Sequence, residues 1–151
     1  GFFVQCFVFA MEQYQHSIAL MELEDNLSSS MDWLASDLAE SIAVLKCTDD
    51  ELTLQTSDGK IYYTLGTDTQ AKEHFYDLEG KTFYRRENTQ GTRQPMANFI
   101  SCFRVTYYDE TGNPTENASS VKIVEILLEG TWNDTVISQS QAVRLKDSDY
   151  F

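Results

Sequence analysis

Few residues of this chain have the types and spacing that catalysis needs. Nucleophilic catalysis requires an activated serine or cysteine with a histidine base in reach, and the chain has two histidines, His16 and His74. His16 falls in a long predicted helix, and His74 begins a predicted strand among aromatic residues, where a hydrogen-bonded structural histidine is the commoner outcome. No G-x-S-x-G motif is present, and the helix acids Glu12, Glu22 and Glu24 do not form a pair across a cleft. The sequence therefore predicts neither an enzyme nor a cofactor.

One turn gathers oxygen ligands that suit calcium. Its acidic and amide side chains are Asp109, Glu110, Asn113 and Glu116. Their spacing is not that of an EF-hand loop, and Asp, Asn, Gly and Pro are also what turns require for backbone reasons. The turn interpretation is favoured over a metal site.

The three cysteines have no metal-binding spacing such as C-x-x-C. Cys6 lies in an apolar run. Cys47, just past the predicted helix, and Cys102, in a predicted strand, would pair as a disulfide in an oxidising compartment, and two buried free thiols are the equal alternative.

Aromatic residues at strand positions would line a sugar or peptide groove, but at alternating positions they are more often core and cross-strand pairs. They are Tyr62, Tyr63, Phe75, Tyr76, Phe83, Tyr84, Phe103, Tyr107 and Tyr108.

The composition indicates one globular domain with a strongly acidic surface. The chain has 151 residues, a net charge of −13 and a sequence pI near 4.3, and its length suits a single core. This charge repels phosphate backbones and anionic lipid headgroups, so we do not expect nucleic-acid binding.

The first 46 residues have the pattern of one long helix that positions the rest. After Gly1, the run to Lys46 has no Gly or Pro. It opens with an apolar stretch to Met11, and a stripe at steps of three or four follows. The stripe consists of Leu20, Leu23, Leu27, Met31, Leu34, Leu38, Ile42 and Leu45.

Such a helix would be roughly 65 Å long, about twice the width of a domain of this size. We therefore expect residues 1–19 to project and residues 20–151 to form the head domain. The opening apolar run is shorter than the roughly 20 residues that cross a bilayer, and it lacks the basic flank of a secretory signal. We interpret it as the end of a longer hydrophobic helix, with burial in an oligomer as the rival interpretation.

Seven strands are expected after the helix. Asp58 and Gly59 predict a tight hairpin turn between the first two, and residues 74–78 and 82–86 have the pattern of a second hairpin. The predicted strands are 52–56, 61–65, 74–78, 82–86, 99–108, 121–128 and 142–146. Hairpin order predicts an α+β fold in which an antiparallel sheet packs on the amphipathic part of the helix.

Several segments match one family in order and spacing. Asp37-Leu38-Ala39 resembles that family's helix ending, and residues 52–63 resemble its first hairpin. Phe83-Tyr84-Arg85-Arg86 resembles an aromatic-arginine strand, and residues 142–146 resemble a closing strand. Residues 95–103, the turn at 109–112 and residues 121–128 together resemble a last long hairpin. With the projecting helix, these segments resemble type IV minor pilins and type II secretion pseudopilins, specifically the PilW-type and J-type groups.

Family members carry a peptidase site after glycine and a glutamate at the fifth mature position. Gly1-Phe2 imitates that junction, but Cys6 stands where the glutamate would be, so neither feature is assigned to this chain. Truncation inside the hydrophobic segment would explain both absences.

The resemblance implies a structural subunit whose N-terminal helix is held by the membrane before assembly and by sister subunits afterwards. The head would be extracytoplasmic, in a pilus or pseudopilus, at a tip or initiation complex. The expected assembly residues are Phe2, Phe3, Val4, Phe7, Val8, Phe9, Met11 and Glu12. The alternative is a membrane-tethered extracytoplasmic ligand-binding domain that does not polymerise.

Overall fold

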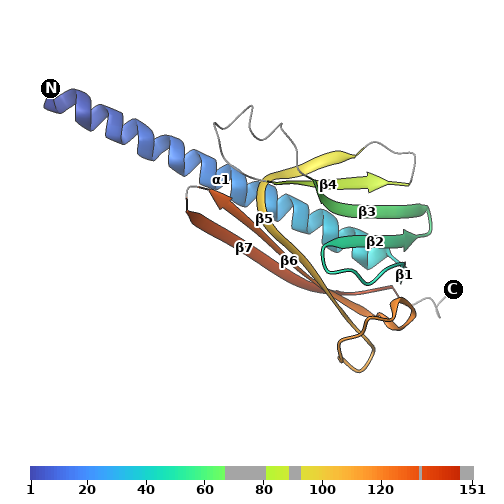
Figure 1. Ribbon diagram of the computed structural model, residues 1–151. Helices are drawn as coiled ribbons and strands as arrows, with labels where there is room; N and C mark the ends of the chain where they lie inside the picture. The colour runs from blue at the N-terminus through green and yellow to red at the C-terminus, as the bar shows by residue number, and fades with distance from the viewer. Residues whose placement is uncertain (67–80, 89–92, 133, 147–151) are drawn as a thin grey trace.

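The fold is one long helix packed on a seven-stranded antiparallel sheet (Figure 1). The computed structural model describes residues 1–66, 81–88, 93–132 and 134–146. Neighbours in the sheet follow sequence order from β1 to β7. The predicted α+β class and the antiparallel sheet are confirmed. The elements are α1 (Phe2–Glu40), β1 (Ala43–Val44), β2 (Glu51–Thr56), β3 (Gly59–Gly66), β4 (Lys81–Glu87), β5 (Gln94–Tyr108), η1 (Ala118–Ser120), β6 (Ile123–Trp132) and β7 (Thr135–Arg144).

The helix ends earlier than the sequence pattern predicted. Helix α1 stops at Glu40, and Ser41 is extended, with its N–H donating to the Leu38 carbonyl. The chain then pairs with β2, because the N–H of Ile42 donates to the Gln55 carbonyl and the N–H of Leu45 to the Thr53 carbonyl. The expected membership of Ile42 and Leu45 in the helical stripe is therefore wrong. Sheet hydrogen bonds replaced a last helical turn that no sequence signal forbade.

The predicted β2–β3 hairpin is confirmed, and its turn requires glycine. Thr56 pairs with Gly59 across Ser57 and Asp58, and Gly59 has a φ of 141°. A Cβ on Gly59 would lie 2.1 Å from Asn88 Oδ1, which accepts a hydrogen bond from the Lys60 N–H. The backbone of β3 is thus held close to the end of β4.

Strand β4 is where the sequence predicted a strand, but its neighbours differ. It pairs with β3 on one edge and with β5 on the other, so the hairpin expected between 74–78 and 82–86 is wrong in its partner. Residues 74–78, including His74, lie outside the described residues.

The last three strands are longer than expected. Strand β5 begins at Gln94 and carries bulges against both neighbours, and Phe99 within it has a φ of 61°. Strand β7 begins at Thr135, seven residues before the predicted start at Ala142. Its side chains are mostly exposed, so the alternation that marks a half-buried strand is weak there.

The core lies between the sheet and the second half of α1. The helix packs chiefly on β5, β6 and β7, and also touches β2. Its buried apolar residues are Leu23, Leu27, Met31, Leu34 and Leu38, and they meet sheet residues such as Phe83, Ile126 and Leu128. The inward face of β5 buries Phe99, Phe103, Val105 and Tyr107.

Candidate assembly surface on the projecting helix

The first half of α1 extends beyond the sheet and presents apolar side chains to solvent. Phe3 is 87% exposed and Phe7 is 66% exposed, and burial of apolar side chains begins only at Leu23. Figure 1 places the N-terminus at the far end of the helix from the sheet. We call the expected set the assembly surface, and its members are Phe2, Phe3, Val4, Phe7, Val8, Phe9, Met11 and Glu12, all exposed.

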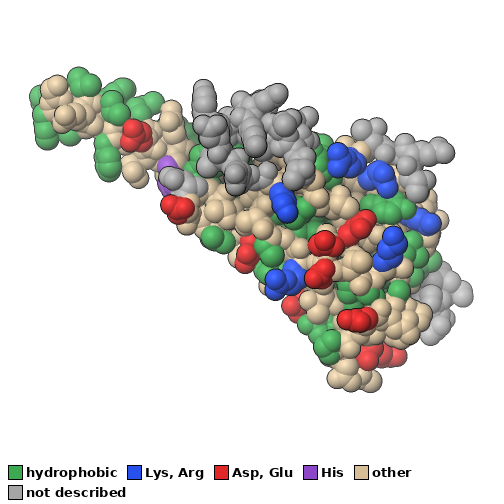
Figure 2. Space-filling model, viewed as in Figure 1, with side chains coloured by type: hydrophobic (Ala, Val, Ile, Leu, Met, Phe, Trp, Pro, Cys, Tyr) green, Lys and Arg blue, Asp and Glu red, His purple; other side chains and the backbone are tan. Residues whose placement is uncertain are grey.

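The assembly surface surrounds the helix instead of forming a single stripe. Phe2, Phe3 and Val4 point in well-separated directions around an axis that turns about 100° per residue. In Figure 2, hydrophobic side chains gather along this end, interrupted by few charges. Fully burying one side chain of this size contributes about 1.5–3 kcal/mol. Burial of these side chains against another molecule would therefore contribute a large favourable free energy of association.

No helix within the described residues is long and apolar enough to cross a membrane. Glu12 is the first charged side chain along α1, and it closes the apolar opening.

A buried ion pair fixes the opposite end of α1 on the sheet. The Arg85 side chain donates from Nε to Asp37 Oδ2 at 2.8 Å and from Nη2 to Oδ1 at 3.3 Å. Tyr63 on β3 also donates to Asp37, and Arg85 Nη1 reaches Glu87 at 2.8 Å. The guanidinium lies 4.9 Å from the ring centre of Trp33. Two parallel hydrogen bonds to a carboxylate set orientation as well as distance, so this network fixes the direction in which the helix projects.

Burial governs the protonation of this network. Burial and the hydrogen bond to Asp37 raise the pKa of Tyr63 well above its ordinary value. Burial lowers the pKa of Arg85, but its hydrogen bonds to Asp37 and Glu87 outweigh that effect and leave the pKa raised. The phenol stays neutral and the guanidinium stays charged, as the geometry requires.

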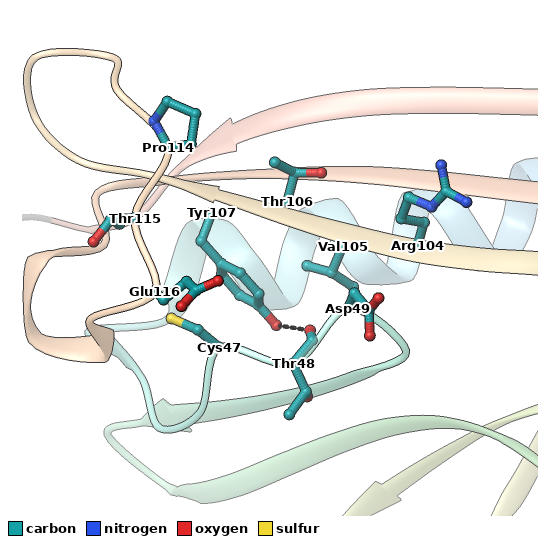
Figure 3. A pocket seen from close by; sticks show the side chains of 10 residues that line it. All are labelled: Cys47, Thr48, Asp49, Arg104, Val105, Thr106, Tyr107, Pro114, Thr115 and Glu116. Carbon is teal, nitrogen blue, oxygen red and sulfur yellow. Dashed lines mark hydrogen bonds between the residues drawn. The ribbon is translucent and has the colours of Figure 1, made fainter.

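A second feature of the head is a cavity of about 500 Å³ beside the carboxyl end of β5 (Figure 3). Its lining includes Cys47, Asp49, Arg104, Tyr107 and Glu116. The Tyr107 hydroxyl donates to the Thr48 carbonyl at 2.7 Å, drawn as the dashed line in Figure 3.

The chemistry of this cavity does not favour nucleophilic catalysis. Burial, and then the charge of Glu116, raise the pKa of the Cys47 thiol, whereas a reactive cysteine needs a lowered pKa. Histidine is absent from the described residues that line the cavity, and His16 lies on α1.

The disulfide that the sequence left open is not formed in the structure. Cys47 and Cys102 are half-buried free thiols, and Cys6 is an exposed one. Cys102 sits opposite Glu129 in the β5–β6 ladder, while Cys47 lines the cavity.

The calcium candidates of the 109–116 turn do not converge on one point. Asp109 Oδ1 accepts hydrogen bonds from the Thr111 N–H, the Thr111 hydroxyl and the Asn113 N–H, and these bonds lower the pKa of Asp109. Glu110 lies 3.7 Å from Arg144, and Glu116 lines the cavity. Across the described ranges, no group of three or more His, Cys, Asp or Glu side chains could hold a metal.

The aromatic strand residues mainly build the core. Tyr63 stacks on Phe83 with ring centres 5.5 Å apart, and Phe83 meets Phe103 at 4.8 Å. Phe75 and Tyr76 are outside the described residues. Tyr63, Phe83 and Phe103 are therefore buried in the core and do not line a sugar or peptide groove.

Sequence reasoning missed the link between Asp37 and Arg85, although both lie in segments that carried the family resemblance. The two residues are 48 positions apart, so only the register of β4 beneath the helix end brings them together. A lone acid on the buried face of an amphipathic helix was the available signal.

Comparison with known proteins gives no family assignment, since no protein-family model and no curated protein matches this chain.

Proposed function

We propose that this protein is a structural subunit of the minor pilin or pseudopilin kind, which assembles through its projecting helix with sister subunits. The observation that carries the proposal is the assembly surface, in which seven apolar side chains are exposed to solvent. The segment resemblance supports the same assignment. Neighbouring helices, or a bilayer before assembly, would satisfy these side chains.

In this proposal the head holds the helix in a fixed direction. The Asp37–Arg85 pair and the buried leucines hold the second half of α1 on the sheet. A subunit built in this way presents its sheet outward while its helix enters a bundle. We propose, from the same resemblance, that the head lies outside the cytoplasm, at a tip or initiation complex.

The test is incorporation of a variant carrying Phe3→Asp and Phe7→Asp, co-expressed with the helix-bearing subunits of the same cell. We expect the variant to be lost from the recovered complex while circular dichroism of the purified chain shows a folded head. Val136→Asp is the matched control, because it adds the same charge at an apolar position on β7 that is 58% exposed. Normal incorporation of the double variant contradicts the proposal.

A second candidate function is a membrane-tethered binding domain that does not polymerise, and the 500 Å³ cavity favours it. Its volume lies within the range of small-molecule sites. Stoichiometric co-purification with other helix-bearing subunits supports assembly. A monomer with saturable binding of a small molecule, abolished by Tyr107→Ala, supports the second candidate.

A further inference from the structure

A second apolar stripe runs along α1 on the side turned away from the sheet. Val4, Phe7, Met11, Tyr14, Ile18 and Met21 follow one another at steps of three and four. Their exposed fractions range from 39% for Ile18 to 66% for Phe7. We call this set the outer seam. It continues past the assembly surface to the part of the helix that reaches the head.

The outer seam and the buried stripe occupy different faces of the helix. With about 100° of turn per residue, the seam residues lie roughly 120–180° from Leu27, whose side chain is fully buried against the sheet. The sheet cannot cover both faces of one helix. The seam is therefore free to pack against an element outside the head.

The spacing of the seam suits one partner helix. Alternating steps of three and four place side chains on a narrow line that packs by knobs into holes along a second helix. The pattern ends sharply, because the next position in the series is Asp25. The partner contact should therefore end close to Met21.

The charges beside the seam favour a partner that is not a second copy. Helix α1 carries seven acidic residues and no Lys or Arg, and Glu22 and Asp25 flank the end of the seam. A parallel second copy would bring Asp25 against Asp25, and each whole chain carries a charge of −13. Like charges at such positions disfavour pairing, whereas Lys or Arg on the partner would select it.

We propose that the outer seam binds an amphipathic helix of a different protein, one with an apolar three-four stripe flanked by Lys or Arg near Glu22 and Asp25. This inference rests on the proposed function, because it names the partner chemistry of the projecting helix. It adds Tyr14, Ile18 and Met21 to the interacting residues. The direction of the partner follows from its charges, which must lie at the head end of the seam.

The test uses two synthetic helical peptides about three heptads long, with the same apolar stripe and either Lys or Glu at the flanking positions. Fluorescence anisotropy with the full chain should show binding of the Lys peptide, weakened by salt. The Glu peptide should bind at least about tenfold more weakly. Equal affinity for both peptides overturns the charge selection, and with it the proposal.

Variants locate the binding site. Ile18→Asp with Met21→Asp should weaken binding of the Lys peptide by more than about tenfold. Gln13→Asp is the matched control, since it adds a charge at an exposed position away from the seam and should leave binding unchanged. An unaffected Ile18 and Met21 variant overturns the proposal. Sedimentation that shows a dimer of this chain abolished by Met21→Asp overturns it in favour of a second copy.

Failure here is distinguishable from failure of the proposed function. If the Phe3 and Phe7 variant is lost from the cellular complex but the Ile18 and Met21 variant is incorporated normally, assembly stands and the seam inference falls. If both variants are incorporated normally, the proposed function falls as well.

Discussion

The two halves of α1 have the same backbone and opposite surroundings. Residues 2–21 expose most of their apolar side chains, whereas residues 23–40 bury a leucine stripe and Asp37 against the sheet. Helical stability in proteins comes mainly from tertiary packing of an apolar face. The second half therefore has its partner within the chain, whereas the proposed function assigns the partner of the first half to a sister subunit. Substitutions in the two halves should therefore differ in their effect on stability.

Removing the buried carboxylate should be the most damaging change. Asp37→Ala leaves the Arg85 guanidinium buried without its main partner, and breaking a buried pair in this way costs about 3–5 kcal/mol. Urea denaturation of the full chain measures the loss. Asp32→Ala is the control, because Asp32 is exposed on the same helix and should change stability little. An equal effect of the two substitutions would contradict the assigned role of Asp37.

Truncating a leucine of the second half should cost nearly as much, whereas truncating an aromatic residue of the first half should not. Leu27 is fully buried, so Leu27→Ala should lower the free energy of unfolding by about 2–5 kcal/mol. Phe7→Ala should change it by less than about 0.5 kcal/mol. If Phe7→Ala proved as costly in the purified chain, the first half would have a partner within it.

Alkaline pH should weaken only the half that is fixed to the sheet. The pKa of Tyr63 is raised from an ordinary value of 10.0, so the fold holds the neutral phenol that the unfolded chain would ionise. This stabilisation is complete below about pH 10 and declines as the pH rises further. Tyr63→Phe should flatten the decline of the unfolding free energy above pH 10. The same slope in both proteins would contradict the assignment.

The smallest effect is expected at the point where the two halves meet. A Cβ on Gly130 of β6 would lie 2.6 Å from Leu23 Cδ1, and Leu23 is the first buried leucine of α1. The end of a leucine side chain can shift, so Gly130→Ala should cost about 1 kcal/mol, the low end of overpacking. Thermal denaturation measures this cost. A stabilised variant would indicate that β6 and α1 are not in close contact there.

The parts of the fold that follow from local patterns were predictable from the sequence. The leucine stripe set the buried face of α1, and Asp58 with Gly59 set the first hairpin. The helix end was mispredicted because residues 42–45 are apolar and residues 41–46 lack Gly and Pro, and only pairing with β2 ends the helix before them. The predicted start of β7 was wrong for the same reason. Its first residues alternate only weakly, and pairing with β6 is what makes them a strand.

The assembly surface could be predicted from the sequence more readily than the ion pair that fixes the helix on the sheet. The exposure of Phe3 and Phe7 followed from an apolar run with no matching face in the chain, whereas the Asp37–Arg85 pair depends on the sheet register. The outer seam could not be identified from the sequence alone. Its side chains form a separate face only because the sheet covers the opposite face of the helix.

Under the proposed function, other helices cover the first half of α1 in the assembled complex. Amide hydrogen exchange tests it directly, compared between the purified chain and the complex recovered from cells. We predict fast exchange for residues 2–21 in the purified chain, slow exchange for residues 23–40 in both samples, and strong added protection of residues 2–21 in the complex. Unchanged exchange of residues 2–21 in the complex would contradict the account.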